Sequence, residues 1–397
     1  MFALGDARVF QSGPSASDAI QQANQALARR DVAGALALLD RADAGGFTVA
    51  SGMTRALALR LQGDLPGAIA VLDRVLALDP YEFMALLSKG AILEMMGKPR
   101  LAVGIYRNAL KIAPPQERCP PQLVAQIAKA RDLVQAEAAR LREHLRDAVA
   151  DLRGQCGSED GDRFDESLDV FAGVSPPVKQ EPLLLNYARL PSISFYDRAH
   201  FPWLAQLEAG TDMIVAELKT FLAEPGEAFA PYIAFPKGVP VNQWKDLNHS
   251  QDWSAAFLWK NGVKQDGACD RCPGTTALLE SLPMATQDGY APTVTFSALK
   301  PRTHIPPHTG SSNVRLLTHL PLILPGPARF RVGNTTRDWE MGQAWVFDDT
   351  IEHEAWNDAD QMRVILIFDV WNPFLTEAEK ALITAMLNAQ REYLTAG

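Results

Sequence analysis

The chain has 397 residues, of which 47% are hydrophobic and 21% are charged, and its formal net charge is −9. This length has room for two domains with substantial cores, and the acidic balance argues against a nucleic-acid partner, which would favour a basic face. Four scattered cysteines exclude a disulfide framework, and the first residues lack the features of a signal peptide. Since no stretch approaches the roughly 20 apolar residues of a spanning helix, we expect a cytoplasmic protein with no transmembrane segment.

The first third of the chain repeats with a fixed period. Residues 63–70 are matched by residues 97–104, and Pro80 and Pro114 are likewise 34 residues apart. The period resembles that of tetratricopeptide repeats, in which small side chains lie where paired helices cross and a proline follows the second helix. We therefore predict an all-α tetratricopeptide-like solenoid over residues 1–118, with an ordinary helical bundle as the alternative.

Residues 119–182 are predicted to form a long helix and a linker. Pro120 and Pro121 open a segment rich in alanine, leucine and charged residues, whose apolar positions recur at helical spacing to about Arg153. The polar, glycine-rich residues 155–162 then have the composition of a linker. We place the boundary between the helical part and the next domain near this run.

From residue 183 to residue 397 the composition changes. Proline, tryptophan and β-branched residues become more frequent, and short alternating runs are separated by Gly, Pro and Asn turns. Such runs indicate a mainly antiparallel β-sandwich or jelly roll, with flanking helices near residues 203–221 and 377–393. The chain is thus expected to be an α+β multidomain protein. The predicted strands are residues 293–297, 315–320, 329–332, 344–347 and 364–368.

Two histidines stand in segments that suit metal binding. His308 lies within residues 303–310 and His353 within residues 347–356, and Arg363 follows the second histidine by ten residues, at the start of an apolar run. Neutral imidazole suits ferrous iron. A guanidinium can pair with a carboxylate through two parallel hydrogen bonds. The three residues together suggest a redox-metal site that also binds a dicarboxylate.

The predicted strands also carry polar residues at alternating positions. Because residues two apart share a face of a strand, Arg315, Leu317 and His319 project together. Ser297 and Thr295 form a similar polar row on another strand. An inward polar face is costly to bury unless ligands or partners satisfy it. The alternation therefore predicts a polar cavity inside the roll.

Three motifs carry a resemblance to a known family. The chain has HTG at residues 308–310, DDTIEHE at residues 348–354 and DVWNP at residues 369–373. With their surroundings, from about residue 190 to residue 376, they resemble the aspartyl/asparaginyl β-hydroxylase family of iron(II)/2-oxoglutarate-dependent oxygenases. The resemblance implies a double-stranded β-helix, which is a jelly-roll or cupin-like fold. Tetratricopeptide-like repeats ahead of such a domain are also a familiar arrangement in this family.

The resemblance implies which residues bind the metal. His308 and His353 would be the catalytic ligands of Fe(II). Most 2-oxoglutarate oxygenases carry a carboxylate two residues after the first histidine, where this chain has Gly310. Water would then take the position of the missing carboxylate.

The resemblance also implies how the co-substrates and the substrate bind. Arg363 and Ser297 would hold the distal carboxylate of 2-oxoglutarate, and His319 would approach the carboxylate nearer the metal. Dioxygen would be the second co-substrate, and Arg315 would hold an acidic side chain of the substrate. The animal members carry a second arginine where this chain has Leu317, so either 2-oxoglutarate has one contact fewer or the substrate differs in charge.

Other conspicuous residues are expected to be structural. Cys269 and Cys272 have the spacing of half a zinc site, but the sequence has no second such pair. Asp348 and Asp349 are expected to support a turn or to lie behind the metal ligands. Tryptophans such as Trp253 are expected to belong to the core.

The implied function is hydroxylation of an aspartyl or asparaginyl side chain, or a related acidic group, in a protein or peptide that the repeats would present. Three alternatives stay open: hydroxylation of a small amino acid or natural-product peptide, hydroxylation of a lipid acyl chain, and a non-catalytic metal-binding scaffold. The sequence leaves the oligomeric state open as well.

Overall fold

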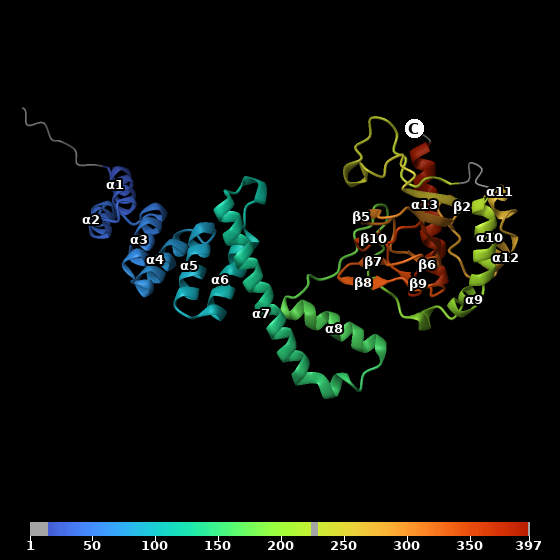
Figure 1. Ribbon diagram of the computed structural model, residues 1–397, viewed down its shortest axis with the longest axis horizontal. Coiled ribbons are helices and arrows are strands. Elements are labelled where there is room, and N and C mark those ends of the chain that lie inside the picture. Colours follow the sequence, from blue (N-terminus) through green and yellow to red (C-terminus); the bar gives the residue numbers. More distant parts are fainter. Residues whose placement is uncertain (1–14, 224–228, 396–397) are drawn as a thin grey trace, which may run out of the picture. The chain divides into compact units, whose positions relative to one another are not determined.

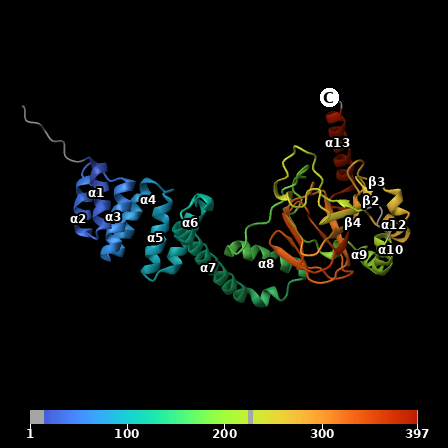
Figure 2. The same ribbon diagram turned by 45° about the horizontal axis from the view of Figure 1, so that its top comes forward.

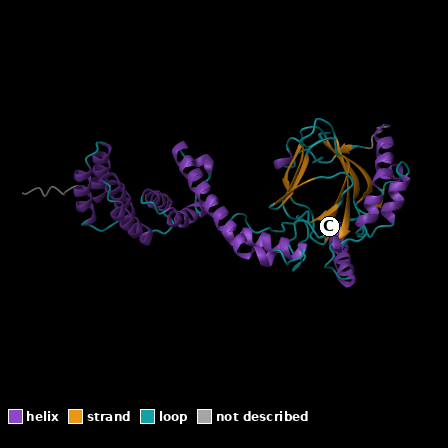
Figure 3. Cartoon of the chain, turned by 60° about the horizontal axis from the view of Figure 1, so that its bottom comes forward, coloured by secondary structure: helices purple, strands orange, loops and turns teal. Residues whose placement is uncertain are grey.

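The computed structural model describes residues 15–223 and 229–395 (Figure 1). It divides into two compact units, one ending at Ser175 and the other beginning at Pro176. In the described ranges the first unit is built of helices, whereas the second contains all the strands (Figure 3). This order confirms the predicted fold class, a helical array followed by an antiparallel β domain.

The first unit begins with three helix pairs. Gly63 ends the first helix of the second pair in the left-handed conformation, with φ 89°, and Gly97 has φ 70° at the equivalent place. Glycine adopts this conformation without strain, which explains its recurrence. The helix-pair array is confirmed, and its classification as tetratricopeptide repeats stays a prediction. The helices are α1 (Ala16–Ala28), α2 (Val32–Asp43), α3 (Val49–Gln62), α4 (Leu65–Leu78), α5 (Phe83–Met95) and α6 (Pro99–Lys111).

Small residues recur where the paired helices cross. Ala35, Ala68 and Ala102 hold equivalent positions in α2, α4 and α6, and all three are buried. Asp31 and Asp64 accept hydrogen bonds from the backbone N–H groups of the first turns of α2 and α4, at 2.9 Å in each case. Such caps satisfy amide groups that have no partner within the helix, so Asp31 and Asp64 fix where α2 and α4 start, whereas α6 has no side-chain cap.

The long helix predicted after the repeats is confirmed as α7 (Pro121–Arg153), which follows the short turn η1 (Gln116–Arg118). The linker predicted over residues 155–162 is wrong in part, because α8 (Ser158–Ala172) begins inside it. Arg153 pairs with Asp165 at 2.9 Å, so an ion pair holds α8 against the end of α7. Neither α7 nor any other described helix is both long and apolar enough to cross a membrane.

The second unit consists of two antiparallel sheets. The larger has the order β1-β2-β4-β11-β6-β9, with β3 beside β2, and the smaller has the order β5-β10-β7-β8. All five predicted strands are present, within a few residues of their predicted ends. The larger sheet contains β1 (Ala230–Pro231), β2 (Trp253–Lys260), β3 (Val263–Lys264), β4 (Val294–Leu299), β6 (Arg315–Ile323), β9 (Trp345–Phe347) and β11 (Arg363–Trp371). The smaller contains β5 (His304–His308), β7 (Ala328–Val332), β8 (Thr335–Asp338) and β10 (His353–Asn357).

Helices flank the sheets, and α10 and α12 lie together on one side of this unit (Figure 2). The single helix predicted near residues 203–221 is wrong in detail, because Gly210 separates two helices. A Cβ on Gly210 would lie 2.4 Å from the side chain of Leu278, so a larger residue would require that side chain to shift. The helix predicted near residues 377–393 is confirmed. The helical elements are η2 (Arg198–His200), α9 (Leu204–Ala209), α10 (Thr211–Ala223), η3 (Asn242–Trp244), α11 (Asp266–Cys269), α12 (Pro273–Glu280) and α13 (Glu377–Thr395).

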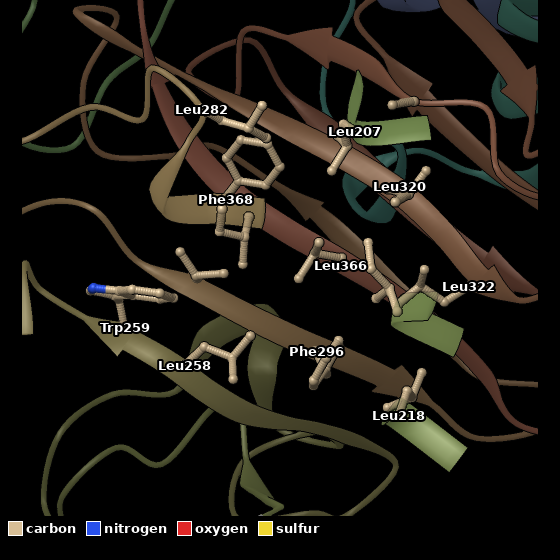
Figure 4. Close-up of a cluster of buried hydrophobic side chains, with 14 of the residues drawn as sticks. Leu207, Leu218, Leu258, Trp259, Leu282, Phe296, Leu320, Leu322, Leu366 and Phe368 are labelled. Carbon is tan, nitrogen blue, oxygen red and sulfur yellow. The ribbon is translucent and has the colours of Figure 1, made fainter. Parts of the chain in front are cut away.

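Each face of the larger sheet has its own core. On one face, Phe296 of β4 and Leu366 of β11 pack with Leu218 of α10 (Figure 4). Cys269 and Cys272 are buried in this same cluster. Because neighbours along a strand face opposite ways, the intervening residues of β4, β6 and β11 face the smaller sheet. This inner face carries the polar residues that the alternation pattern had singled out.

Candidate active site

The two histidines of the sequence motifs lie directly opposite each other. His308 ends β5 and His353 begins β10, and the two residues are paired across these antiparallel strands. Their ring centroids are 4.0 Å apart. The Nδ1 atoms of His308 and His353 lie 2.8 and 3.0 Å from the carbonyl oxygens of Pro306 and Ile351. A neutral imidazole bonded in this way donates from Nδ1 and keeps the Nε2 lone pair available to a metal.

Burial favours the uncharged form of both imidazoles. It lowers the pKa of His308 below its ordinary value and that of His353 well below. The neutral ring is the form that binds metals. The pair therefore presents two nitrogen donors that need no deprotonation at neutral pH.

Arg363 is a buried cation that forms no ion pair with the described residues. It begins β11, is only 1% exposed, and its pKa is lowered by burial from its ordinary value to about 9. Its Nε and Nη1 atoms are buried and have no hydrogen-bond partner among the described residues. The guanidinium carbon lies 4.4 Å from the ring centroid of Trp339, a cation–π contact. A buried charge is costly unless it is paired, so the residue is suited to an anionic ligand.

Ser297 shares the inner face with Arg363. It lies on β4 opposite Ile365 of the adjacent strand β11, so Arg363 is its diagonal neighbour. Diagonal neighbours on one face are within reach of long side chains. Ser297 is buried, and its hydroxyl oxygen accepts a hydrogen bond from Trp253 Nε1 at 3.0 Å. The structure thus brings a buried hydroxyl and a buried guanidinium to one part of the sheet.

His319 lies on the inner face of β6, the strand on the other side of β11. Burial, with Arg363 and His308 nearby, lowers the pKa of His319 well below its ordinary value. Its Nδ1 atom is buried and has no partner within the described part of the chain. His319 is therefore a neutral ring with a polar atom left to satisfy, in the region between Arg363 and the histidine pair.

Arg315 differs from Arg363 because an acid already lies beside it. Its Nη1 donates to the carbonyl oxygen of Tyr290 at 2.9 Å and lies 3.9 Å from the carboxylate of Asp369. Burial raises the pKa of Asp369, and Arg315 opposes this rise. Leu317 lies between Arg315 and His319 on the same face of β6 and is partly buried. The inner face of this strand is thus apolar between its two polar residues.

Asp349 occupies the space beside Gly310. A Cβ on Gly310 would lie 1.8 Å from Asp349 Oδ2, and the backbone N–H of Gly310 donates to the carbonyl oxygen of Asp349 at 2.6 Å. Burial and the neighbouring acids Asp348 and Asp369 raise the pKa of Asp349 well above its usual range. Within the described ranges, no group of three or more His, Cys, Asp or Glu residues could hold a metal ion. The protein donors of the candidate metal site are therefore the two imidazoles.

Comparison with known proteins identifies the family. The family model "Aspartyl/Asparaginyl beta-hydroxylase" matches residues 214–373, which include every residue of the site described above. The "Ornithine lipid ester-linked acyl 2-hydroxylase" of Rhizobium tropici is 36% identical over 202 residues, which are 50% of this chain and 67% of that protein. The chain belongs to the aspartyl/asparaginyl β-hydroxylase family. The "Aspartyl/asparaginyl beta-hydroxylase" of Mus musculus is 28% identical over 333 residues, or 82% of this chain.

This member of the β-hydroxylase family matches only part of its mammalian relatives. The chain spans 44% of the length of the mouse protein and 43% of the human one. Among solved structures, the cupin domain of Schizosaccharomyces pombe Cnp3 covers 31% of this chain and 67% of its own, with a TM-score of 0.21 and 10% identity.

The aromatic residues of the candidate site were not predicted to belong to it from the sequence. Trp253 belongs to the core, as expected, but it also donates to Ser297, and its ring centroid lies 6.1 Å from that of His308. Trp244 lies closer to His308, with centroids 4.9 Å apart, and Trp339 lies under Arg363. No local pattern distinguishes such tryptophans from core ones, because the contacts that place them join distant segments.

The two aspartates of the DDTIEHE motif have separate roles. Asp348 is buried and accepts hydrogen bonds from the backbone N–H of Thr350 at 2.9 Å and from its hydroxyl at 2.6 Å. It supports the turn before β10, as expected. Asp349 instead directs its carboxylate to Gly310. Asp348 therefore stabilises the turn, whereas the adjacent Asp349 lies at the candidate site.

Proposed function

We propose that this protein is an iron(II)- and 2-oxoglutarate-dependent dioxygenase that hydroxylates an aspartyl or asparaginyl side chain, or a related acidic group, in a protein or peptide. The observation that carries the proposal is Arg363. Its buried, unneutralised guanidinium shares the inner face of the roll with Ser297 and His319, close to two imidazoles whose Nε2 atoms are available. A dicarboxylate bound beside a metal satisfies this arrangement.

The donor set fits ferrous iron. Neutral imidazoles suit this metal, and two protein ligands leave positions for a bidentate 2-oxo acid and for dioxygen. Gly310 adds no ligand, since the carboxylate of Asp349 fills the space where its side chain would begin. When bound, iron with 2-oxoglutarate and dioxygen supplies the oxidising power to convert a C–H bond into C–OH, with release of succinate and carbon dioxide.

The remaining side chains bind and orient the co-substrate. Arg363 pairs with the distal carboxylate of 2-oxoglutarate, and Ser297 donates its hydroxyl proton to the same group. His319, which is neutral, donates to the carboxylate nearer the metal. Trp339 covers one side of the Arg363 guanidinium and excludes water from it. The charge of the anion is thus matched by one buried cation and by fixed neutral donors.

Arg315 and the residues around it form the part of the site that is proposed to bind the substrate. Arg315 is oriented by Asp369 and by the carbonyl of Tyr290, and its guanidinium is the group that would hold an acidic side chain. A second candidate function, hydroxylation of a lipid acyl chain, is favoured by Leu317. This apolar residue lies between Arg315 and His319, and the Rhizobium relative, 36% identical, is named for that activity.

The repeats are proposed to present a protein substrate, and the cytoplasm is the proposed location. A groove of about 330 Å³ lies among α1, α3, α4 and α5. Its lining is mainly apolar, with Asn24, Thr54, Arg60 and Ser88 as polar groups. Stacked repeats offer a surface to an extended segment, and this groove supports such a use.

Mass measurement separates the candidate functions. The purified protein with Fe(II), 2-oxoglutarate and dioxygen is incubated with a cell lysate, and proteins and extracted lipids are each examined for a gain of one oxygen atom. We expect succinate formation and a mass gain on a protein, both lost in His308→Ala. A gain confined to lipids would favour the second candidate. Absence of iron-dependent succinate formation would contradict the proposal.

A further inference from the structure

A hydrogen bond between two buried side chains links the metal side of the site to the co-substrate side. Trp253 is the first residue of β2 and pairs with Leu299 of β4, so Ser297 is its diagonal neighbour on the inner face. Trp253 Nε1 lies 3.0 Å from Ser297 Oγ, and both residues are buried. An indole N–H is a donor only, so the serine oxygen is the acceptor in this bond.

The direction of this hydrogen bond determines which further hydrogen bonds the Ser297 hydroxyl can form. A hydroxyl group has one proton to donate and two lone pairs to accept with. Because Trp253 fills an acceptor position, the Ser297 proton is left to donate elsewhere, and no described residue accepts it. Arg363, the other diagonal neighbour of Ser297, has two buried N–H groups without a described partner. The Ser297 hydroxyl and the Arg363 guanidinium therefore both have donor groups without a described acceptor on the inner face of the larger sheet.

The ring of Trp253 is held on several sides, which fixes the direction of its N–H. It is stacked on Tyr232, with centroids 4.1 Å apart and an interplanar angle of 12°. Its centroid lies 5.8 Å from that of Trp244 and 6.1 Å from that of His308. A side chain packed in this way keeps one orientation, so the hydrogen bond to Ser297 has a fixed direction.

We infer that Trp253 is a positioning residue for the co-substrate. By donating to Ser297 it sets the rotation of the hydroxyl, so that the serine proton points to the carboxylate paired with Arg363. The same ring packs beside His308 and so holds the co-substrate contacts at a fixed distance from the metal ligands. The inference rests on the proposed function, because it concerns how that carboxylate is bound.

If Trp253 only packed in the core, removing its N–H while keeping an aromatic ring would leave 2-oxoglutarate binding unchanged. Trp253→Phe keeps an aromatic ring on Tyr232 and removes only the N–H. Loss of one oriented hydrogen bond should weaken 2-oxoglutarate binding by about threefold to tenfold, with the change in KM and little change in kcat. In a Ser297→Ala background, the same substitution should have no further effect, because Trp253 acts through Ser297. Trp259→Phe is the matched control, since Trp259 lies on the same strand but in the other core.

Calorimetry on the full-length protein tests the inference. Each variant is loaded with Mn(II), which prevents turnover, and titrated with 2-oxoglutarate. Support requires weaker binding by Trp253→Phe, unchanged binding by Trp259→Phe, and a double variant no weaker than Ser297→Ala alone. If Trp253→Phe binds like the wild type, or if the two effects multiply, the inference is overturned. A wild-type protein that binds no 2-oxoglutarate would instead overturn the proposed function and this inference with it.

A measurement without any ligand tests the hydrogen bond directly. In protein with ¹⁵N-labelled tryptophan, the indole signal lost in Trp253→Phe identifies that residue, and Ser297→Ala should shift it. Trp259 serves again as the reference, since its signal should stay in place. An unchanged Trp253 signal would show that the hydrogen bond is absent in solution and would overturn the inference even if 2-oxoglutarate binds.

Discussion

Replacing Arg363 by methionine tests two effects of this buried cation separately. One is its cost to the stability of the folded protein, and the other is its contribution to 2-oxoglutarate binding. Burial lowers the pKa of Arg363 from its ordinary value to about 9. At about 1.4 kcal/mol for each pKa unit, this shift corresponds to roughly 5 kcal/mol. Since the folded-state pKa is the lower one, this cost is present in full below about pH 9 and diminishes as the pH rises toward the ordinary pKa of the guanidinium. Methionine carries no such cost.

Arg363→Met without ligand is therefore expected to melt no lower than the wild type at neutral pH. The gain should be smaller than roughly 5 kcal/mol, because the variant also loses the contact between the guanidinium and Trp339. Replacement of a buried charge by an apolar side chain is often neutral or stabilising. A differential scanning measurement of the Mn(II)-loaded protein gives this comparison.

With 2-oxoglutarate present, the order of stability should reverse. A ligand that binds only the folded state raises the melting temperature by mass action. Loss of a shielded charge-assisted pair costs about 2–5 kcal/mol, which is about 30-fold to several thousand-fold in Kd. The wild type should therefore gain stability on adding 2-oxoglutarate, whereas Arg363→Met should gain almost none, and its KM should rise in parallel.

Arg315→Met is the matched comparison. Because Asp369 already balances Arg315, we expect this variant to keep its response to 2-oxoglutarate and to lose coupling to the hydroxylated substrate. If Arg363→Met keeps the wild-type response, the reasoning about its unneutralised charge is refuted. If Arg315→Met weakens 2-oxoglutarate binding more than Arg363→Met does, the roles of the two arginines are reversed.

Three further predictions concern the metal, the glycine beside it and the two units. His308→Ala and His353→Ala should each lose bound iron and 2-oxoglutarate turnover while remaining folded by circular dichroism; iron content equal to the wild type in either would remove the assignment. Gly310→Ala should lower the free energy of unfolding in urea by about 1–3 kcal/mol, because its Cβ meets the carboxylate of Asp349, and Asp349→Ala in the same chain should restore most of this loss; equal destabilisation of the double variant would contradict the clash. A fragment beginning at Pro176, once shown to be folded by its melting curve, should still convert 2-oxoglutarate to succinate but show a raised KM for its protein substrate; unchanged efficiency would leave the repeats without a role in presentation.

The start of that fragment illustrates what the structure adds to the sequence. Composition suggested that the β domain begins at residue 183, but the compact unit begins at Pro176. Gln180 donates to Asp348 at 2.6 Å, and the backbone N–H of Glu181 donates to Thr350 at 2.7 Å. These contacts join segments more than 160 residues apart, so no local pattern reveals them. A fragment begun at residue 183 would lack both.

Most of the elements could be predicted because their signals are local. A 34-residue period and alternating apolar residues report directly on helix pairs and strands. The start of α8 could not be found in this way, because its polar composition resembles that of a loop and its ion pair with α7 is a tertiary contact. The close approach of Leu278 to Gly210 is likewise a tertiary contact, which the local sequence does not reveal.

Some residues of the candidate site could also be predicted from local sequence, whereas others depend on tertiary contacts. The local sequence around His308 and His353 and the spacing of Arg363 led to these three residues, and the structure brings them to the inner face of one roll. The positions of Trp253 and Asp349 depend instead on strand register and on the approach of distant turns. Their residue types alone did not indicate what they contact.

The contrast between the two arginines also suggests why a helical array accompanies this site. Arg363 has no acidic partner in the described part of the chain, so an anion bound there gains almost the full charge interaction. Arg315 already faces Asp369, so an acidic substrate group must compete with a carboxylate that the protein supplies, and the adjacent Leu317 offers apolar contact only. Recognition at the catalytic centre should then be strong for the co-substrate and weak for the substrate. Additional binding surface outside the roll, such as the groove among α1, α3, α4 and α5, would supply the affinity for the substrate that the catalytic centre lacks.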